Sequence, residues 1–322
     1  MTVQHYPRLA AYTPVEGVIT LCEVDSVDIA LANVLVGVSH AQPQDGISII
    51  VDNTPQNIIA VPYIDIEITD ETARQFILIE DLLKKMERWP GIDGDIGLAI
   101  TGDVSKKLIK LVQQNCALKF VTVIAEPTIE LTLAALENNL SSQQPDSWLW
   151  ISVHAGCAQT KIKQQGKNIA TNVSSEHPMP ADAAVAIRLS KERNKSVSAT
   201  IKSVYEPNTN DPLLQPTHAL ETLLSEQADV ENSVLIHSMP NTAQGNIELY
   251  RLEQFLNEKR TEELEDIPWQ SLKPSWYNLS SILGDIGVCQ LPLMLLLQTA
   301  WQQEQPLITI ATEDSTRFIW QL

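Results

Sequence analysis

The chain has 322 residues, of which 44% are hydrophobic and 19% are charged, and its formal net charge is −18. This composition suits one large or two small globular domains with enough apolar surface for a core. A chain this acidic is repelled by nucleic acid and by anionic membranes, so we expect neither as a partner.

Apolar runs of strand length alternate with helical patterns along the first part of the chain. The helix that the pattern predicts at 69–88 has Thr69 as its candidate N-cap, and apolar residues recur every three or four positions. Strands are predicted at 17–24, 58–68 (extended), 96–102, 119–125, 147–156, 183–190 and 197–205, and further helices at 103–114 and 128–139.

The second part repeats this order of elements. Helices are predicted at 217–228, 245–260 and 286–301, and strands at 233–238, 275–281, 306–312 and 317–322. The order β-α-β-α-β-β therefore occurs twice, although no residue-level repeat accompanies it. The segments 157–180 and 206–216 are polar and are interpreted as connections.

The sequence also bounds the compartment and the kind of site. Its four cysteines are widely spaced and form no CxxC pair, which indicates reduced, mostly buried thiols in a cytoplasmic protein. Cys289 lies on an apolar helix and is expected in the core, whereas Cys157 follows Gly156 and is expected to be more exposed. No signal peptide is visible, and the apolar stretch 288–301 is too short to span a bilayer. No metal or cofactor motif occurs, so neither is predicted.

One short stretch points to a possible site. Residues 120–136 read FVTVIAEPTIELTLAAL, which predicts a strand, a tight turn and a helix. A side chain at such a turn projects beside the positive end of the helix, where many enzymes hold a nucleophile. Here the turn carries Glu126 and Pro127, so a carboxylate takes that position.

Three further segments carry a resemblance to the β-ketoacyl synthases. MPADAAVAIRL (179–189) resembles their segment in which Pro-x-Glu-Gly-Ala leads into a strand, with Asp182 and Ala183 replacing the glutamate and glycine. VLIHSMPNTAQGNIEL (234–249) resembles the segment with the catalytic His-Gly-Thr-Gly-Thr, and NLSSILGDIGVCQLPLML (278–295) resembles the one with a lysine followed by Gly-His. The residues that match in order in the last two are Thr242, Gly245, Asn246, Glu248, Gly284 and Gly287.

From about residue 70 to its end, the chain therefore resembles the thiolase-fold superfamily, in its ketosynthase branch. The resemblance implies an α/β fold of five layers, αβαβα, built of two βαβαββ halves in one compact unit. The halves would comprise residues 1–212 and 213–322. Since members of this fold usually pair through the central sheet, it also implies a homodimer or a heterodimer.

Carried over by position, the resemblance also indicates a degenerate active site. The nucleophile position falls on Glu126, and the second histidine position falls on Asp285. The first histidine position falls on Ser238, or on His237 if the gap is placed otherwise, and the lysine position falls on Ser280. Glu126 cannot hold an acyl group as a thioester, and Asp285 would place negative charge where an oxyanion develops. No residue is therefore assigned as catalytic.

These replacements favour a non-catalytic protein that binds another protein. By resemblance, it would be an accessory ketosynthase subunit, or an adaptor or chaperone for a type VI secretion effector or spike component. The charge slightly favours the adaptor, because acyl carrier proteins are themselves acidic. The alternative is a diverged acyl-thioester enzyme, a hydrolase or decarboxylase, that uses Glu126 and Asp285 as an acid–base pair. Against that, Glu126 could simply cap its helix.

Overall fold

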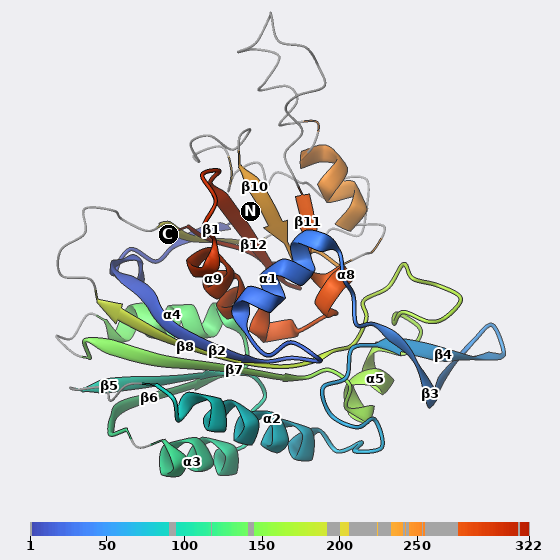
Figure 1. Ribbon diagram of the computed structural model, residues 1–322, viewed down its shortest axis with the longest axis horizontal. Coiled ribbons are helices and arrows are strands. Elements are labelled where there is room, and N and C mark those ends of the chain that lie inside the picture. The colour runs from blue at the N-terminus through green and yellow to red at the C-terminus, as the bar shows by residue number, and fades with distance from the viewer. Residues whose placement is uncertain are drawn as a thin grey trace, which may run out of the picture.

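The structure is a computed structural model. It describes residues 2–89, 95–116, 118–140, 145–191, 200–205, 224, 233–240, 242, 245–252, 254, 276–314 and 316–321. Two large sheets lie one above the other with helices between and outside them, and a long two-stranded hairpin extends to one side (Figure 1).

The first sheet has five strands, in the order β2-β8-β7-β5-β6. Strands β5 and β7 are parallel to each other, as are β5 and β6, whereas β8 runs antiparallel to both β7 and β2. Their bounds are β2 (Tyr12–Thr20), β5 (Ile96–Thr101), β6 (Phe120–Glu126), β7 (Ser147–Ala155) and β8 (Asp182–Lys191).

The second sheet has six strands, in the order β1-β9-β13-β12-β10-β11. Their bounds are β1 (Thr2–His5), β9 (Thr200–Tyr205), β10 (Val234–His237), β11 (Trp276–Asn278), β12 (Leu307–Glu313) and β13 (Thr316–Gln321). If β1 is set aside and the strands of each sheet are counted in chain order, both sheets read 1-5-4-2-3, with the same relative directions. The repeated element order of the sequence therefore corresponds to a repeated topology.

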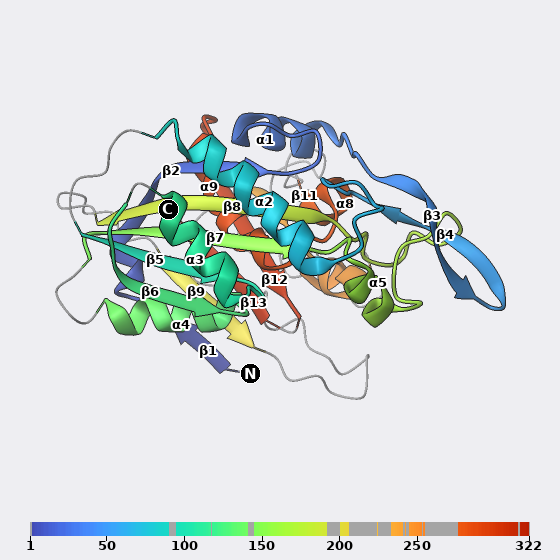
Figure 2. The ribbon, with the colours of Figure 1, turned by 90° about the horizontal axis from the view of Figure 1, so that it is seen from below.

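The helices complete five layers. On the outer face of the first sheet lie α2 (Glu71–Met86) and α3 (Lys106–Asn115) (Figure 2), and between the sheets lie α4 (Ile129–Asn139) and α9 (Gln290–Ala300) (Figure 1). The helical residues 245–252 pack through Leu249 and Leu252 on the outer face of the second sheet. We refer to the β2 and β5–β8 unit as the first half and to the β9–β13 unit as the second half.

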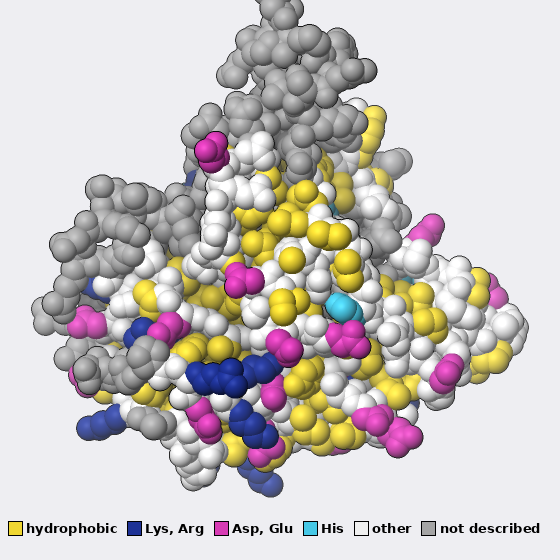
Figure 3. Space-filling view, viewed as in Figure 1, with side chains coloured by type: hydrophobic (Ala, Val, Ile, Leu, Met, Phe, Trp, Pro, Cys, Tyr) yellow, Lys and Arg dark blue, Asp and Glu magenta, His cyan; other side chains and the backbone are white. Residues whose placement is uncertain are grey.

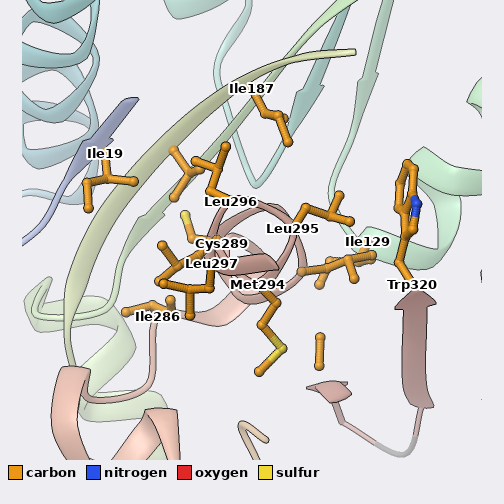
Figure 4. Packing of buried hydrophobic residues seen from close by; sticks show 14 of the residues in the cluster. Ile19, Ile129, Ile187, Ile286, Cys289, Met294, Leu295, Leu296, Leu297 and Trp320 are labelled. Carbon is orange, nitrogen blue, oxygen red and sulfur yellow. The ribbon is translucent and has the colours of Figure 1, made fainter. Parts of the chain in front are cut away.

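The core between the two sheets is centred on α9. Its apolar residues 291–297 are all buried, as expected for a stretch of helix that is apolar on every side. Figure 4 shows side chains of α9 spreading toward Ile19 and Ile187 of the first sheet, Ile129 of α4 and Trp320 of the second sheet. Each fully buried leucine contributes about 1.5–3 kcal/mol, so this helix holds the two halves together.

Helix α2 begins one residue later than the sequence suggests. The side chain of Asp70 accepts a hydrogen bond from the backbone N–H of Ala73 at 2.8 Å, so Asp70 is the N-cap and the prediction of Thr69 was wrong. The apolar positions Leu78, Ile79 and Leu82 are fully buried against the first sheet.

Several elements were not predicted. The additional elements are η1 (Leu9–Ala11), α1 (Val27–Val36), the hairpin of β3 (Gln42–Val51) and β4 (Thr54–Ala60), α5 (Gln159–Gln165), α8 (Leu279–Leu283) and η3 (Gly287–Cys289). Helix α5 lies in the segment 157–180, which was interpreted as a connection. The predicted first strand lies earlier, as β2, and the strand predicted at 275–281 is short and continues as α8. Of the extended segment predicted at 58–68, only residues 58–60 are strand, at the end of β4, so the prediction for 61–68 was wrong.

Some predictions fall elsewhere. The helix predicted at 217–228 lies outside the described residues apart from Leu224, and the one at 245–260 is described only in part. Strand β9 precedes residue 212 but hydrogen bonds in the second sheet, and a boundary between the halves at 212 stays a prediction. Cys289 is buried, as predicted, but Cys157 is also buried, at 1% exposure, so its expected exposure was wrong. None of the described helices has the length and apolar character needed to cross a membrane.

Candidate functional site

Two cavities adjoin where the halves meet. The first has a volume of about 410 Å³ and the second about 320 Å³, and both are lined by Asp285, Gln290, Thr312 and Asp314. The second cavity lies at the carboxyl ends of the parallel strands, because Gly102, Pro127 and Ala155, at the ends of β5, β6 and β7, line it. This is the edge at which open α/β sheets commonly bind ligands.

The structure brings together part of the predicted site. Ser238, Ser280 and Asp285 all line the first cavity. Glu126 is half-buried at the end of β6 and lines neither of these cavities. His237 also lines neither; it is 3% exposed, and its Nδ1 accepts a hydrogen bond from the N–H of Met239 at 3.3 Å. Burial lowers the pKa of His237 to about 4, so its imidazole is neutral at pH 7.

The positions that the resemblance reserves for histidines are hydrogen bonded into one network around Gln290. The hydroxyl of Ser238 donates to Gln290 Oε1, and the backbone N–H of Thr312 donates to both, at 2.9 and 3.1 Å. Gln290 Nε2 in turn donates to Asp285 Oδ1 at 3.3 Å, which also accepts from the N–H of Gly287 at 3.0 Å. The network therefore holds these side chains in fixed orientations without an imidazole.

Two glycines set the path of the chain around Asp285. Gly284 and Gly287 have φ angles of +76° and +50°, which favour glycine. A Cβ on Gly287 would lie 2.4 Å from Nδ1 of His154, so the backbone packs directly on that ring. His154 and Asp285 thus line the second cavity together. Burial lowers the pKa of His154, against the opposing effect of Asp285 and Asp182.

The N-terminus of α4 is occupied by a side chain from the second half. The carboxylate of Glu313, at the end of β12, accepts hydrogen bonds from the N–H of Ile129 at 3.0 and 2.9 Å, and from that of Glu130 at 3.5 Å. Thr128 is the N-cap and accepts from Leu131 at 3.3 Å. Glu313 and Thr128 therefore cap this helix, rather than Glu126.

The environment of Glu313 shifts its acidity strongly. Burial raises the pKa of Glu313 to about 7, which outweighs the lowering effect of its bonds to the N–H groups of Ile129 and Glu130. The nearby carboxylates of Asp314 and Glu130 raise it further. At neutral pH, this group therefore exchanges between a charged and an uncharged cap.

Two other acidic residues of the matched motifs have structural roles. Asp182 is 1% exposed; it forms a bidentate ion pair with the fully buried Arg74 and accepts from the N–H of Cys157 at 3.2 Å. Glu248 pairs with Arg317 in the second half, at 2.8 and 3.1 Å. Each pair joins a helix to a strand within one half, and none of the four residues lines either cavity.

The sequence interpretation did not assign four residues that the structure places at the site. They are His154, Gln290, Thr312 and Glu313. One available signal was the polar Gln290 directly before the apolar run 291–297, and another was the acidic turn of Glu313 and Asp314 between two apolar strands. Within the described residues, no three His, Cys, Asp or Glu side chains are grouped as a metal site requires.

Comparisons with known proteins bear on the fold. No protein-family model and no curated protein sequence matches this chain. Solved structures do match: the ishigamide ketosynthase/chain length factor is 14% identical with a TM-score of 0.59, over 96% of this chain and 98% of that one. A ketosynthase in complex with its chain length factor from Xenorhabdus doucetiae is 9% identical with a TM-score of 0.61, over 97% and 98%.

A third match has a higher TM-score. A type II PKS acyl-carrier protein in complex with its ketosynthase is 10% identical with a TM-score of 0.66, over 96% of this chain and 98% of that one. At such identities the similarity shows the fold and nothing finer. The chain has the thiolase-like ketosynthase fold over nearly its whole length, which confirms the fold predicted from the sequence.

Proposed function

We propose that this chain is a non-catalytic ketosynthase-like protein that works by binding another protein, as the accessory subunit of a ketosynthase-type pair. The observation that carries the proposal is the Glu313 carboxylate at the N-terminus of α4. Acyl transfer at that helix end needs free N–H groups beside a nucleophile to stabilise the oxyanion. Here the carboxylate of Glu313 occupies those groups.

The same geometry weighs against the diverged enzyme. An acid–base pair must face one substrate, but of the two cavities Asp285 lines both and Glu126 lines neither. The network of Ser238, Gln290 and Asp285 also uses the polar atoms that would otherwise meet a substrate carbonyl. The site is therefore built for a fixed structure more than for turnover.

The exposed edge of the first sheet supports a binding role. None of the described strands pairs with the outer side of β6, which Figure 2 shows at the margin of the sheet. Val121 and Val123 on this strand are 41% and 39% exposed, and Leu131 of the adjacent α4 is 48% exposed. An unpaired apolar edge favours pairing with another strand, so natural proteins usually cover one.

The partner that fits this edge best is a chain with the same fold. Two of the similar structures are named for a ketosynthase together with a chain length factor. We infer that the partner of this chain is a cysteine-bearing ketosynthase whose matching edge strand continues the sheet across a heterodimer. The other possibilities are a homodimer and the adaptor for a type VI secretion effector, in which the fold is a scaffold.

The test is to isolate the tagged chain from its native cells at low ionic strength and to identify co-purifying proteins by mass spectrometry. A ketosynthase that forms a 1:1 complex by light scattering is the expected result. Co-purification of a secreted effector or spike component would instead favour the adaptor, and recovery of the chain alone would contradict both. The isolated chain should also hydrolyse no acyl thioester. Hydrolysis that is lost in Glu126→Gln would instead favour the diverged enzyme.

Matched variants locate the surface. Val123→Lys places a charge on the free edge of β6 and should abolish the complex, because it would bury an unpaired charge at the interface. Val173→Lys, at a position 73% exposed in a loop, serves as the control and should leave the complex intact. Loss of binding in both variants, or in neither, would exclude β6 as the binding edge.

A further inference from the structure

The β3–β4 hairpin projects from the body of the molecule. Figures 1 and 2 show it extending to one side of the two large sheets, and its strands pair only with each other in a separate two-stranded sheet. A register shift between Pro43 and Ser48 isolates its outer part, in which residues 48–51 pair with residues 54–57. A two-stranded ribbon by itself is marginally stable in water. A third strand would therefore stabilise this outer part.

The outer edge of β4 is already protected. Near the body, the N–H of Ile59 donates to the carbonyl oxygen of Ala170 at 2.9 Å. Two residues further on from Ala170, the N–H of Asn172 donates to the carbonyl oxygen of Asn57 at 3.0 Å. Farther out on β4, Pro55 has no N–H to offer a neighbouring strand. Proline on an edge strand is a common protection against unwanted pairing, so β4 is closed to a partner.

The outer edge of β3 is open. The turn of Asp52 and Asn53 has φ angles of +50° and +61°, as in a type I′ hairpin. In such a hairpin the flanking residues, Val51 and Thr54, form a hydrogen-bonded pair. Because bonded and non-bonded pairs alternate, the N–H and C=O groups of Ile50 point outward, which agrees with the missing N–H of the proline opposite it. Within the described chain, no other segment bonds to them.

The side chains of β3 favour pairing with a further strand. Residues 47–51 read ISIIV, and β-branched residues of this kind favour strands. Ile47 and Ile49 are partly buried against the body, but Ile50 is 74% exposed. Natural proteins often place lysine on such an edge to prevent pairing, whereas residues 42–60 contain no lysine or arginine. The open edge therefore lacks the usual protection.

The charge of the hairpin indicates which strand fits. Asp45 and Asp52 lie at the two ends of the open stretch, both are exposed, and neither forms an ion pair with a described residue. Figure 3 shows hydrophobic and acidic side chains over the projecting hairpin, at the right. A second copy paired antiparallel through this stretch would bring Asp45 of one chain opposite Asp52 of the other, which is unfavourable. A strand with basic residues would instead neutralise both carboxylates.

We propose that the open edge of β3 binds an extended segment of another protein, with β-branched residues at its centre and a lysine or arginine toward each end. The segment adds an antiparallel third strand to the hairpin, through backbone hydrogen bonds to Ser48 and Ile50. In strand addition, main-chain bonds supply affinity and side chains supply specificity. The hairpin and β6 belong to different sheets, so the inference does not depend on the proposed function.

The experiment is selection of a phage-displayed library of short random peptides on the whole chain, followed by calorimetry and hydrogen exchange with an enriched peptide. We expect enrichment of β-branched stretches between two basic residues, and protection of residues 47–51 when the peptide binds. Enrichment of other sequences or of none, or protection confined to other segments, would overturn the proposal. Dimerisation of the chain that is lost in Ile50→Pro would assign the edge to a second copy and would also overturn it.

Matched variants tie the peptide to the edge. Ile50→Pro removes the outward N–H without removing a bond inside the hairpin, and should weaken the affinity about tenfold, whereas Ile50→Val keeps that N–H and should bind normally. At low ionic strength Asp52→Asn should weaken it several-fold, and Asp28→Asn, at an exposed position on α1, should not. Asparagine suits the left-handed turn, so Asp52→Asn still decides if Ile50→Pro disrupts the hairpin. Unchanged affinity in Ile50→Pro or in Asp52→Asn would overturn the proposal.

Discussion

Glu313 has two roles in the site: it links the two halves of the chain, and its raised pKa lets it titrate near neutral pH. Its carboxylate joins β12 of the second half to the first turn of α4 in the first half. Because burial raises its pKa from 4.5 to about 7, the folded chain holds a proton there that the unfolded chain releases above pH 4.5. This contribution to stability is present below pH 4.5 and is lost as the pH rises to about 7.

Replacing Glu313 by glutamine should remove that pH dependence. The amide stays uncharged and keeps an oxygen for the N–H of Ile129, so Glu313→Gln should be more stable than the native chain above pH 7, by up to about 3 kcal/mol. Melting temperatures between pH 5 and 8.5 measure this. Glu304→Gln, at an exposed position, is the control, and an unchanged slope in Glu313→Gln would refute the assignment.

His237 should have the opposite effect. Burial lowers its pKa from 6.5 to about 4, so the unfolded chain binds the proton more tightly. Stability from the neutral ring is present above pH 6.5 and is lost as the pH falls to about 4, by up to about 3 kcal/mol. His237→Asn keeps an acceptor for the N–H of Met239 and should flatten this acid limb in urea unfolding between pH 4 and 7. An acid limb as steep as in the native chain would show that another group titrates.

The site could be predicted only in part from these residues. Position by resemblance pointed to Ser238, which follows a recognisable strand, and to Asp285, which lies between Gly284 and Gly287; both line a cavity, and their role in a site stays a prediction. Glu313 and His154 could not be found that way, since their roles arise when a turn of one half meets a helix and a strand of the other. Sequence patterns indicate local secondary structure, whereas contacts between the two halves depend on how the sheets pack.

At the scale of elements, Arg74 ties α2 to the first sheet. Its guanidinium pairs with Asp182 of β8 and also donates to the carbonyl oxygens of Ile64, Asp65 and Ile68. The ion pair thus also fixes the chain that enters α2. Both partners are fully or almost fully buried, so each charge depends on the other for stabilisation.

Replacing one partner of this pair should lower stability more than replacing both partners. Arg74→Met leaves the Asp182 carboxylate buried and unpaired and should lower the free energy of unfolding by about 3–5 kcal/mol. In the double variant Arg74→Met, Asp182→Asn, part of that loss should return. Guanidinium chloride unfolding of the native chain, Arg74→Met, Asp182→Asn and the double variant gives the coupling energy between the two residues. Purely additive losses would indicate that the pair is not a stabilising unit.

Whether a helix or strand could be predicted depends on how clearly its apolar residues follow the period of that element. Strands β5 to β8 and helices α2 to α4 were predicted because both faces of the sheet are covered and the apolar periods are clear. Helix α1 was missed because its apolar residues are spread around it, with Val36 76% exposed. The β3–β4 hairpin was missed, apart from residues 58–60 of the predicted extended segment, because its strands are mostly exposed and lack a regular alternation.

At the scale of the whole molecule, one face shows how the charged side chains are distributed. On the face shown in Figure 3, Asp and Glu side chains are scattered, and Lys and Arg side chains gather in the lower part. Long-range repulsion from the −18 charge is therefore mixed with local attraction, and salt screens both. Association through the β6 edge, which is apolar, should accordingly change little with ionic strength. Light scattering of the purified complex between 50 and 500 mM salt measures this, and dissociation on adding salt would indicate a charged interface.

The two halves should also unfold as one unit, because α9 of the second half packs into β2 of the first. A Cβ on Gly17 of β2 would lie 2.1 Å from Leu296 Cδ2, so the glycine leaves the space that the leucine fills. Leu296→Ala should cost about 2–5 kcal/mol through the cavity it leaves, and Gly17→Ala should cost about 1–3 kcal/mol through overpacking. The double variant should cost less than the sum, because the new methyl group enters the space that the leucine vacates.

Hydrogen exchange with mass spectrometry measures this coupling in both sheets. Peptides from β7 and β12 should lose protection to the same extent in Leu296→Ala, since they share the core that α9 fills. Loss confined to the second sheet would show that the halves open separately. Additive costs in the double variant would show that Gly17 and Leu296 do not compete for the same space.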